Sequence, residues 1–130
     1  MAAEVVTRSV RMWLDDDGIV QQVSAPGSDY TLEVAHDVCA RIRALAPGKP
    51  HPMLVDITLL RSISRDARTF FARQTTDSGI SAVALLIASP LARVVGNFFM
   101  RASPATVPTR LFTSRDEARS WLHNFKERTP

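Results

Sequence analysis

The sequence has little cysteine and no long apolar segment. The single cysteine, Cys39, cannot form an internal disulfide, and its place in a helical apolar pattern indicates a small buried residue. The most apolar stretch, Ile80–Ala88, has nine residues, far fewer than the roughly 20 that cross a bilayer. The first residues include Glu4 and lack a basic block followed by an apolar one, so no signal peptide is expected. These absences favour a protein of the reducing cytoplasm that does not bind a membrane.

Lysine is almost missing as well. Of 16 basic residues only Lys49 and Lys126 are lysines, and the others are arginines. Arginine favours bidentate contacts with carboxylate or phosphate, although a GC-rich genome gives the same composition. The formal net charge of +3 is too small to indicate nucleic-acid binding by itself. Because the basic residues are spread along the chain without an alternating aromatic platform, nucleic acid is not an expected partner.

The length and composition predict one globular domain. The chain has 130 residues, of which 45% are hydrophobic and 22% charged, values typical of a protein with a real core. No internal repeat or linker is visible. We expect a single domain over residues 8–126, with flexible ends at 1–7 and 127–130 that lack a pattern to hold them down.

Hydrophobic periodicity predicts alternating strands and helices. Period-2 alternation and short apolar runs predict strands at 8–14, 19–24, 53–57, 80–88 and 108–113. Stripes of apolar residues at three- and four-residue spacing predict helices that begin after Thr31, Ser64, Ser89 and Ser114. The order ββαβαβαβα predicts an α/β sandwich with a mixed, mainly parallel sheet covered by helices.

The hairpin turn Asp15–Gly18 invites a calcium-binding interpretation, because three aspartates precede a glycine. A calcium loop needs ligands at alternating positions and a distant bidentate glutamate, and both are missing here. The spacing therefore favours a solvated hairpin turn in which Gly18 supplies a positive φ.

The stretch 52–73 organises the rest of the predicted fold. Its apolar strand ends at Asp56, near the carboxyl edge of the sheet, where open α/β sheets place functional groups. A loop with Ser62 follows, and Ser64 is a plausible N-cap for a basic helix. The strand therefore delivers a polar loop and a helix N-terminus to one edge of the sheet.

The element order and the Asp56-Ile57-Thr58 ending of this strand resemble the STAS domain, whose SpoIIAA-like fold is shared by sulfate-transporter tails and anti-sigma factor antagonists. The segments DDDG, LVDI, ASPLAR, NFF, PTRLFTSRDEA and WL also resemble a group of uncharacterised, actinobacterial-type bacterial proteins with a STAS-like architecture. The resemblance covers most of the chain as element order, but as a motif it covers only the strand and the following loop.

In phosphorylatable antagonists, a serine in an Asp-Ser-Ser-Gly-type segment opens the helix after this strand. The corresponding stretch here is 62–67, in which Arg65 falls close to the place of the serine and the glycine is missing. Ser64 is a neighbour of that place, and a serine before a helix is by default its N-cap. This departure puts the phosphoserine switch in doubt.

The resemblance implies a non-enzymatic regulatory or protein-interaction domain, similar to an anti-sigma factor antagonist without the usual phosphoserine motif. Phe98 and Phe99 are adjacent on a predicted helix, about 100° apart, so one of them is a candidate for a dimer or partner contact. Together with the edge strands they predict a homodimer. The residues expected to bind a partner or act as a switch are Asp56, Thr58, Ser62, Ser64, Arg65, Arg68, Phe98 and Phe99.

The main alternative is a carrier or sensor of a small apolar molecule held between helices and sheet. An enzyme is not expected, because the sequence shows no glycine-rich phosphate loop, nucleophile elbow, paired acids or zinc spacing. We therefore expect no catalytic residues, no metal and no cofactor.

Overall fold

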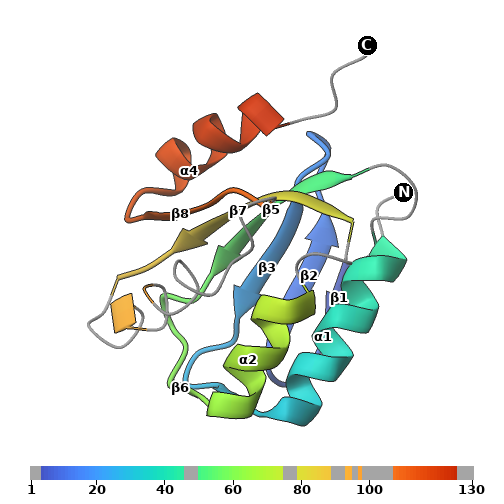
Figure 1. Cartoon of the computed structure of the whole chain (residues 1–130), viewed down its shortest axis with the longest axis vertical. Coiled ribbons are helices and arrows are strands. Elements are labelled where there is room, and N and C mark those ends of the chain that lie inside the picture. Colours follow the sequence, from blue (N-terminus) through green and yellow to red (C-terminus); the bar gives the residue numbers. More distant parts are fainter. Residues whose placement is uncertain are drawn as a thin grey trace.

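The computed structural model of the chain describes residues 4–45, 50–74, 79–88, 93–94, 97 and 107–125. Its main sheet has six strands in the order β1-β2-β3-β5-β7-β8 (Figure 1). The strands are β1 (Glu4–Val6), β2 (Val10–Leu14), β3 (Val20–Ser24), β5 (His51–Asp56), β7 (Ile80–Leu86) and β8 (Thr109–Phe112). β1, β2 and β3 pair antiparallel, whereas β3, β5, β7 and β8 pair parallel. The predicted α/β fold with a mixed, mainly parallel sheet is confirmed.

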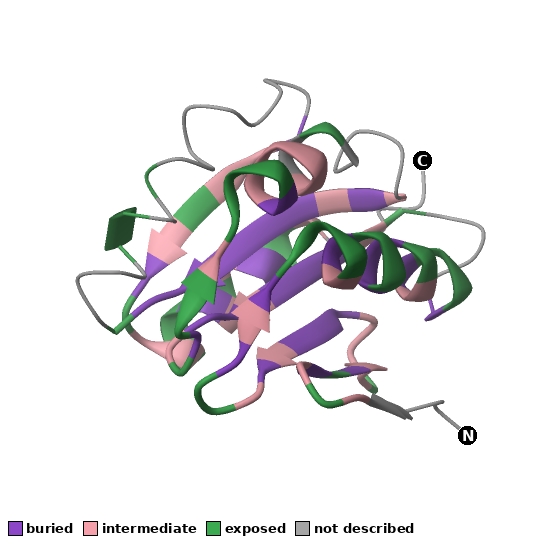
Figure 2. Cartoon of the chain, turned by 90° about the horizontal axis from the view of Figure 1, so that it is seen from below, coloured by how far each residue is buried: buried purple, intermediate pink, exposed green. Residues whose placement is uncertain are grey.

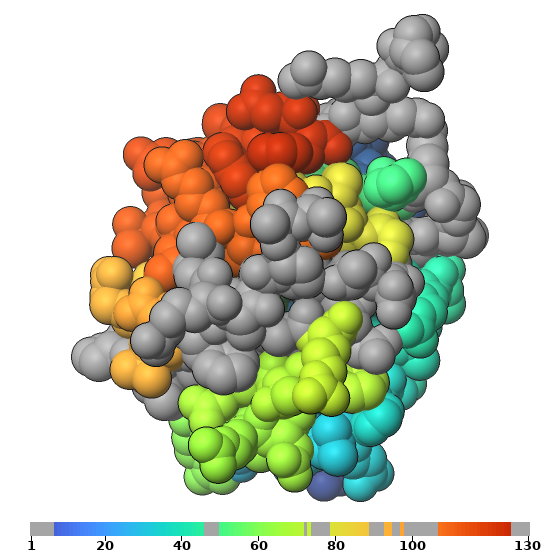
Figure 3. Space-filling model, viewed as in Figure 1, coloured from blue at the N-terminus to red at the C-terminus, as the bar shows by residue number. Residues whose placement is uncertain are grey.

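Helices cover both faces of this sheet, as Figure 1 shows. α1 (Leu32–Leu45) and α2 (Arg65–Gln74) lie side by side on one face, and α4 (Arg115–Leu122) lies on the other, followed by a 3-10 turn at His123–Phe125. In the space-filling view, α1 and α2 adjoin at one end of the molecule, and α4 lies at the other (Figure 3). None of the described helices combines the length and apolar character that a membrane span needs.

The two faces of the sheet carry separate hydrophobic clusters. Under α1 and α2, buried side chains of β2, β3, β5 and β7 pack with the apolar stripe of α1. Under α4, smaller residues of β7 pack with Leu54 of β5 and with Ala118 and Leu122 of the helix. Burial therefore follows the central strands, and exposure follows the outer sides of the helices (Figure 2). The alternation along each strand produces this division because successive side chains point to opposite faces.

Local capping signals set the helix starts. The Thr31 hydroxyl accepts the backbone N–H of Val34 at 3.2 Å, before α1 begins. Ser114 accepts the N–H of Glu117 at 3.3 Å at the start of α4. Each hydroxyl satisfies one of the amide donors that a helix N-terminus leaves without a partner, so both predicted caps are confirmed.

Two features differ from the sequence predictions. Residues 1–7 were expected to be a flexible end, but Glu4–Val6 form β1 and extend the sheet beyond β2. The segments 25–30 and 58–63 lie between the predicted strands and helices, yet they contain β4 (Asp29–Tyr30) and β6 (Ser62–Ile63), which form a separate two-stranded parallel ribbon. Strands of two or three residues are too short for an alternating pattern to reveal, and only their pairing partners define them.

The helix predicted after Ser89 lies mostly outside the described residues. Of that segment the structure describes Arg93, Val94 and Asn97, and all three are helical. Phe98 and Phe99, the aromatic residues expected at a dimer or partner contact, lie outside the described residues.

Candidate functional site

The loop that follows β5, Thr58–Ser64, is held by backbone contacts and is called here the hydroxyl loop. The carbonyl of Leu59 accepts the N–H of Gly27 at 2.9 Å, and the N–H of Arg61 donates to the carbonyl of Ser28 at 2.8 Å. The ribbon between β4 and β6 continues this pairing. The hydroxyl loop is therefore fixed against a second loop, from residues 27–30, along most of its length.

Side chains reinforce this contact at the surface. Arg61 forms an ion pair with Asp29 through two of its nitrogens, and the Ser62 hydroxyl donates to the same carboxylate. The hydrogen bond from Arg61, helped by the one from Ser62, lowers the pKa of Asp29 to about 2. The hydroxyl of Ser62 is thus engaged in a side-chain contact rather than free to act as a nucleophile.

Tyr30 connects the ribbon of β4 and β6 to the main sheet. Its ring is buried and lies 5.9 Å from the ring of Phe71 of α2, centroid to centroid. Its hydroxyl makes a 2.7 Å hydrogen bond with Ser24 and accepts one from the buried Gln22 amide at 3.3 Å. Burial raises the pKa of Tyr30, so it stays a neutral phenol at physiological pH. These buried contacts hold β4 against β3 and α2, and β4 in turn pairs with β6 of the hydroxyl loop.

The start of α2 confirms the interpretation of Ser64 as an N-cap. Its hydroxyl accepts the N–H of Ala67 at 3.1 Å, and Arg65 is the first helical residue. Arg65 is exposed, whereas Arg68, one turn later, is half-buried. Ser62, Ser64 and Arg65 are therefore exposed together where the loop ends and α2 begins, and they form one edge of the surface.

An exposed leucine lies near the start of the hydroxyl loop. Leu59 is 53% exposed, and Leu32, the first residue of α1, is 38% exposed. Scattered single apolar residues at a surface are ordinary. Leu59 differs because its own backbone is pinned by a hydrogen bond, so its side chain is presented from a fixed position.

Asp56 does not belong to this exposed edge. It is 8% exposed, and one of its oxygens accepts both the N–H and the hydroxyl of Thr58, at 2.9 and 2.6 Å. Its other oxygen pairs with Arg115 at the start of α4. The carboxylate therefore shapes the end of β5 from inside and connects it to α4.

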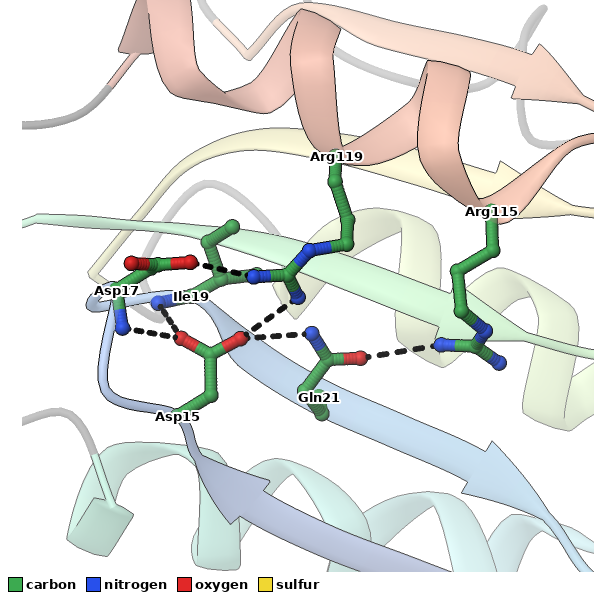
Figure 4. Close-up of polar contacts among 6 residues, drawn as sticks. All are labelled: Asp15, Asp17, Ile19, Gln21, Arg115 and Arg119. Atoms are coloured by element: carbon green, nitrogen blue, oxygen red, sulfur yellow. Dashed lines mark hydrogen bonds and ion pairs between the residues drawn. The ribbon is translucent and has the colours of Figure 1, made fainter.

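A concave site, separate from the hydroxyl loop, lies between the hairpin turn and α4. We call it the hairpin cleft; its volume is about 390 Å³. It is lined by Trp13, Asp15, Asp16, Asp17, Gln21, Arg115 and Arg119. The two arginines are four residues apart on α4, so they point from the same side of the helix toward the turn (Figure 4).

A continuous network of hydrogen bonds crosses the hairpin cleft (Figure 4). Arg119 donates to Asp15 at 3.0 Å and also pairs with Asp17. Gln21 donates from its amide nitrogen to Asp15 at 2.9 Å, and its amide oxygen receives a 3.4 Å contact from Arg115. Burial of Asp15 opposes ionisation, but bonds from Gln21, two backbone amides and Arg119 outweigh it, so its pKa is lowered.

The network corrects the prediction of a solvated aspartate turn. The turn itself and the positive φ of Gly18, 80°, are as predicted. However, the side chain of Asp15 is only 15% exposed and Asp17 is ion-paired. The sequence feature that pointed to this network was the four-residue spacing of Arg115 and Arg119, on either side of the buried Ala118. It could not identify their partners, which lie about 100 residues away.

The described residues contain no group of three or more His, Cys, Asp or Glu side chains arranged to hold a metal ion. Two aspartates of the turn have other partners: Asp15 accepts hydrogen bonds from backbone amides and from Arg119, and Asp17 accepts one from Arg119.

Cys39 provides a direct test of the packing of α1. It is 3% exposed, and its burial raises the pKa of the thiol to about 11, against a partial lowering by Arg43. Because the folded pKa is above the unfolded value of 9.0, this burial stabilises the fold below pH 9 and less so as pH rises toward 11.

We expect iodoacetamide at pH 8 to alkylate Cys39 at least about 100-fold more slowly in the folded protein than in guanidinium chloride, because two pKa units reduce the thiolate about 100-fold. Mass spectrometry of quenched samples measures both rates. Equal rates would mean that α1 does not bury this thiol.

Comparison with known proteins agrees with this architecture. A crystal structure of an uncharacterised protein of the DUF3478 family with a SpoIIAA-like fold, from Shewanella loihica PV-4, is similar with a TM-score of 0.61. The two share 18% identity, over 94% of this chain and 92% of the other. The chain thus has a SpoIIAA-like fold, the fold that the resemblance predicted.

The chain belongs to the family described as a domain of unknown function, DUF7793, whose model matches residues 12–126. A protein of unknown function from Arthrobacter sp. FB24 is 31% identical, over 92% of this chain and 96% of the other, with a TM-score of 0.35. No functionally curated protein matches the sequence.

Proposed function

We propose that this chain is a non-enzymatic, regulatory protein-interaction domain that contacts its partner through the hydroxyl loop. The observation that carries the proposal is the fixed presentation of Leu59. Its side chain is 53% exposed, while the backbone around it is hydrogen-bonded to residues 27 and 28. Because the backbone is already fixed, binding of a partner would not have to order this part of the loop, so more of the free energy of burying the leucine goes into affinity.

The surroundings of Leu59 fit the rim of a protein interface. Arg61, Ser62, Ser64 and Arg65 are all exposed, and they supply guanidinium and hydroxyl groups next to the apolar centre. An apolar centre with a polar rim is the usual organisation of such contacts, with arginine enriched. The hairpin cleft does not support the alternative of a small apolar ligand, because charged and amide side chains make up most of its lining.

The absence of catalysis is part of the proposal. Two of the groups that could do chemistry have structural partners: Asp56 pairs with Thr58 and Arg115, and Ser62 pairs with Asp29. Cys39 is a buried thiol.

Leu59→Asp tests the proposal by placing a charge at the centre of the contact. We expect it to lower the amount of a specific partner recovered by affinity capture from the native host at least about tenfold, which corresponds to about 1.4 kcal/mol. Quantitative mass spectrometry compares the recovered proteins, and the affinity of the purified partner is then measured directly. Intact-mass analysis of the captured chain shows whether a phosphate is present between Thr58 and Ser64.

The matched control is Ser120→Asp, which adds the same charge at an exposed position on α4. It should retain the partner. A partner that binds Leu59→Asp as strongly as the unchanged chain would exclude the hydroxyl loop as the contact. A chemical reaction catalysed by the purified chain would exclude the non-enzymatic role.

A further inference from the structure

We propose that Arg115 is a positioning residue for the hydroxyl loop. It holds Asp56, Asp56 holds Thr58, and Thr58 directly precedes the exposed Leu59. Arg115 begins α4, which packs on the opposite face of the sheet from α2 (Figure 1). The order of the loop therefore depends on a helix outside the proposed contact. The inference deepens the proposed function: its effect on a partner rests on that function, whereas its effect on the loop does not.

Thr58 and Leu59 form the tip of a turn directly after β5. The turn is closed by the N–H of Leu60, which donates to the carbonyl of Ile57 at 3.3 Å, a long distance for such a bond. Asp56 holds the same tip with shorter bonds: one oxygen of its carboxylate accepts the N–H of Thr58 at 2.9 Å and the hydroxyl at 2.6 Å. A charged acceptor makes these bonds stronger than bonds to a neutral one. The position of the turn tip therefore depends largely on where the carboxylate of Asp56 points.

Arg115 fixes the other half of the same carboxylate. The second oxygen of Asp56 accepts a hydrogen bond from a guanidinium nitrogen of Arg115, 59 residues further along the chain. The side chain of Asp56 is only 11% exposed, so water compensates little of its charge. Removing the partner of a buried charge leaves that charge uncompensated, which costs far more than the loss of an exposed ion pair. Without Arg115, the carboxylate is therefore expected to turn toward water and to release Thr58.

Arg115 reaches Asp56 from a fixed base. The helix α4 is held on the sheet by Ala118 and Leu122, which are fully buried. The side chain of Arg115 extends from the first turn of α4 toward β3, where another of its nitrogens contacts the amide oxygen of Gln21 at 3.4 Å (Figure 4). The guanidinium thus links α4 to the end of β5. A lysine would keep the charge that Asp56 needs, but not the planar set of donors that serves both partners.

Amide hydrogen exchange of the full ¹⁵N-labelled chain, followed by nuclear magnetic resonance, tests the effect on the loop without a partner. Arg115→Met removes the charge and keeps an apolar stem. We expect the Thr58 amide to exchange at least about tenfold faster in this variant, because its acceptor is released. The amide of Gly18, which is bonded to a backbone carbonyl in the hairpin turn, should change less than about threefold. Arg115→Lys, which keeps the charge, should restore slow exchange of Thr58 to within about threefold of the unchanged chain.

The matched control is Arg119→Met, the same change one turn later on α4, where the guanidinium pairs with the aspartates of the hairpin turn. It should leave the exchange of Thr58 within about twofold of the unchanged chain. Equal acceleration in both variants would mean that α4 as a whole holds the loop, and it would overturn the proposal. Unchanged exchange of Thr58 in Arg115→Met would do the same. If Arg115→Met does not fold, Arg115→Gln gives the same comparisons, because it also removes the charge while its amide can be hydrated.

The effect on a partner is measured by the same affinity capture as for Leu59→Asp. Arg115→Met should recover at least about threefold less of the specific partner, because binding must then order the loop, and Arg115→Lys should restore the recovery. A partner that is lost in Leu59→Asp but kept in Arg115→Met would overturn this inference and leave the proposed function intact. A partner that is kept in Leu59→Asp would overturn the proposed function, and the exchange of Thr58 would still decide the role of Arg115.

Discussion

Leu54→Ala is expected to lower the free energy of unfolding by about 3 kcal/mol, within the usual range of about 2–5 kcal/mol for such a change in a core. Leu54 is fully buried on β5, which lies between β3 and β7 in the middle of the sheet. It packs against Ala82 and Ala84 of β7 and the inner side of α4. These alanines cannot extend into the space that the leucine leaves, and the paired strands cannot close it, so a cavity persists. Urea denaturation followed by circular dichroism measures the loss.

Leu59→Ala is the matched control, because it deletes the same atoms from a leucine that is 53% exposed. We expect its unfolding free energy to change by less than about 0.5 kcal/mol. Similar losses in both variants would contradict the placement of β5 at the centre of the core. The control also serves the proposed interface, since a stable Leu59 variant shows that a lost partner is not a consequence of unfolding.

The fold was predictable where the sequence repeats a pattern over a whole element. Apolar residues at helical spacing identified α1, and the residues that form this stripe are buried: Ala35, Val38, Cys39, Ile42 and Leu45. The mainly apolar stretch of nine residues that begins at Ile80 identified β7 in the same way. Each signal is local, because it depends only on the hydrophobic period of one element. It can therefore be recognised without knowing which element packs against it.

The sequence patterns did not reveal buried positions whose burial depends on a distant partner. Gln21 and Gln22 are 2% and 3% exposed, although glutamine is usually a surface residue. Hydrogen bonds to Asp15 and to Tyr30 offset the cost of burying the two side-chain amides. No spacing rule could supply these partners, since they come from the turn before β3 and from a ribbon that the sequence does not reveal.

The two candidate sites show the same difference between local patterns and contacts made by distant residues. The loop after β5 was found because a strand end, an N-cap serine and a helix start follow one another in the sequence. The hairpin cleft was missed because its two sides, the turn at Asp15–Gly18 and the helix at Arg115–Arg119, are brought together only by packing of α4 on the sheet.

Asp15→Asn is expected to lower the free energy of unfolding by about 2–3 kcal/mol, the magnitude for hydrogen bonds to a charged group. Its carboxylate accepts bonds from the amides of Asp17 and Ile19, from Gln21 and from Arg119. Asparagine keeps the shape and can still accept from the backbone amides, but its own N–H₂ then meets the donors of Gln21 and Arg119. The variant therefore leaves a partly buried guanidinium opposed by another donor, and α4 loses its tie to the hairpin.

Asp16→Asn is the control for this change, because the neighbouring aspartate is exposed and should cost less than about 0.5 kcal/mol. Thermal unfolding at several pH values adds a second criterion. Since the folded pKa of Asp15 is lowered, its stabilisation is fully present above the unfolded value of 3.8 and is lost as pH falls through the folded pKa. The difference between the unchanged chain and Asp15→Asn should therefore be constant from pH 5 to pH 7 and shrink below about pH 4. A difference that did not depend on pH would assign the loss to packing rather than to the carboxylate.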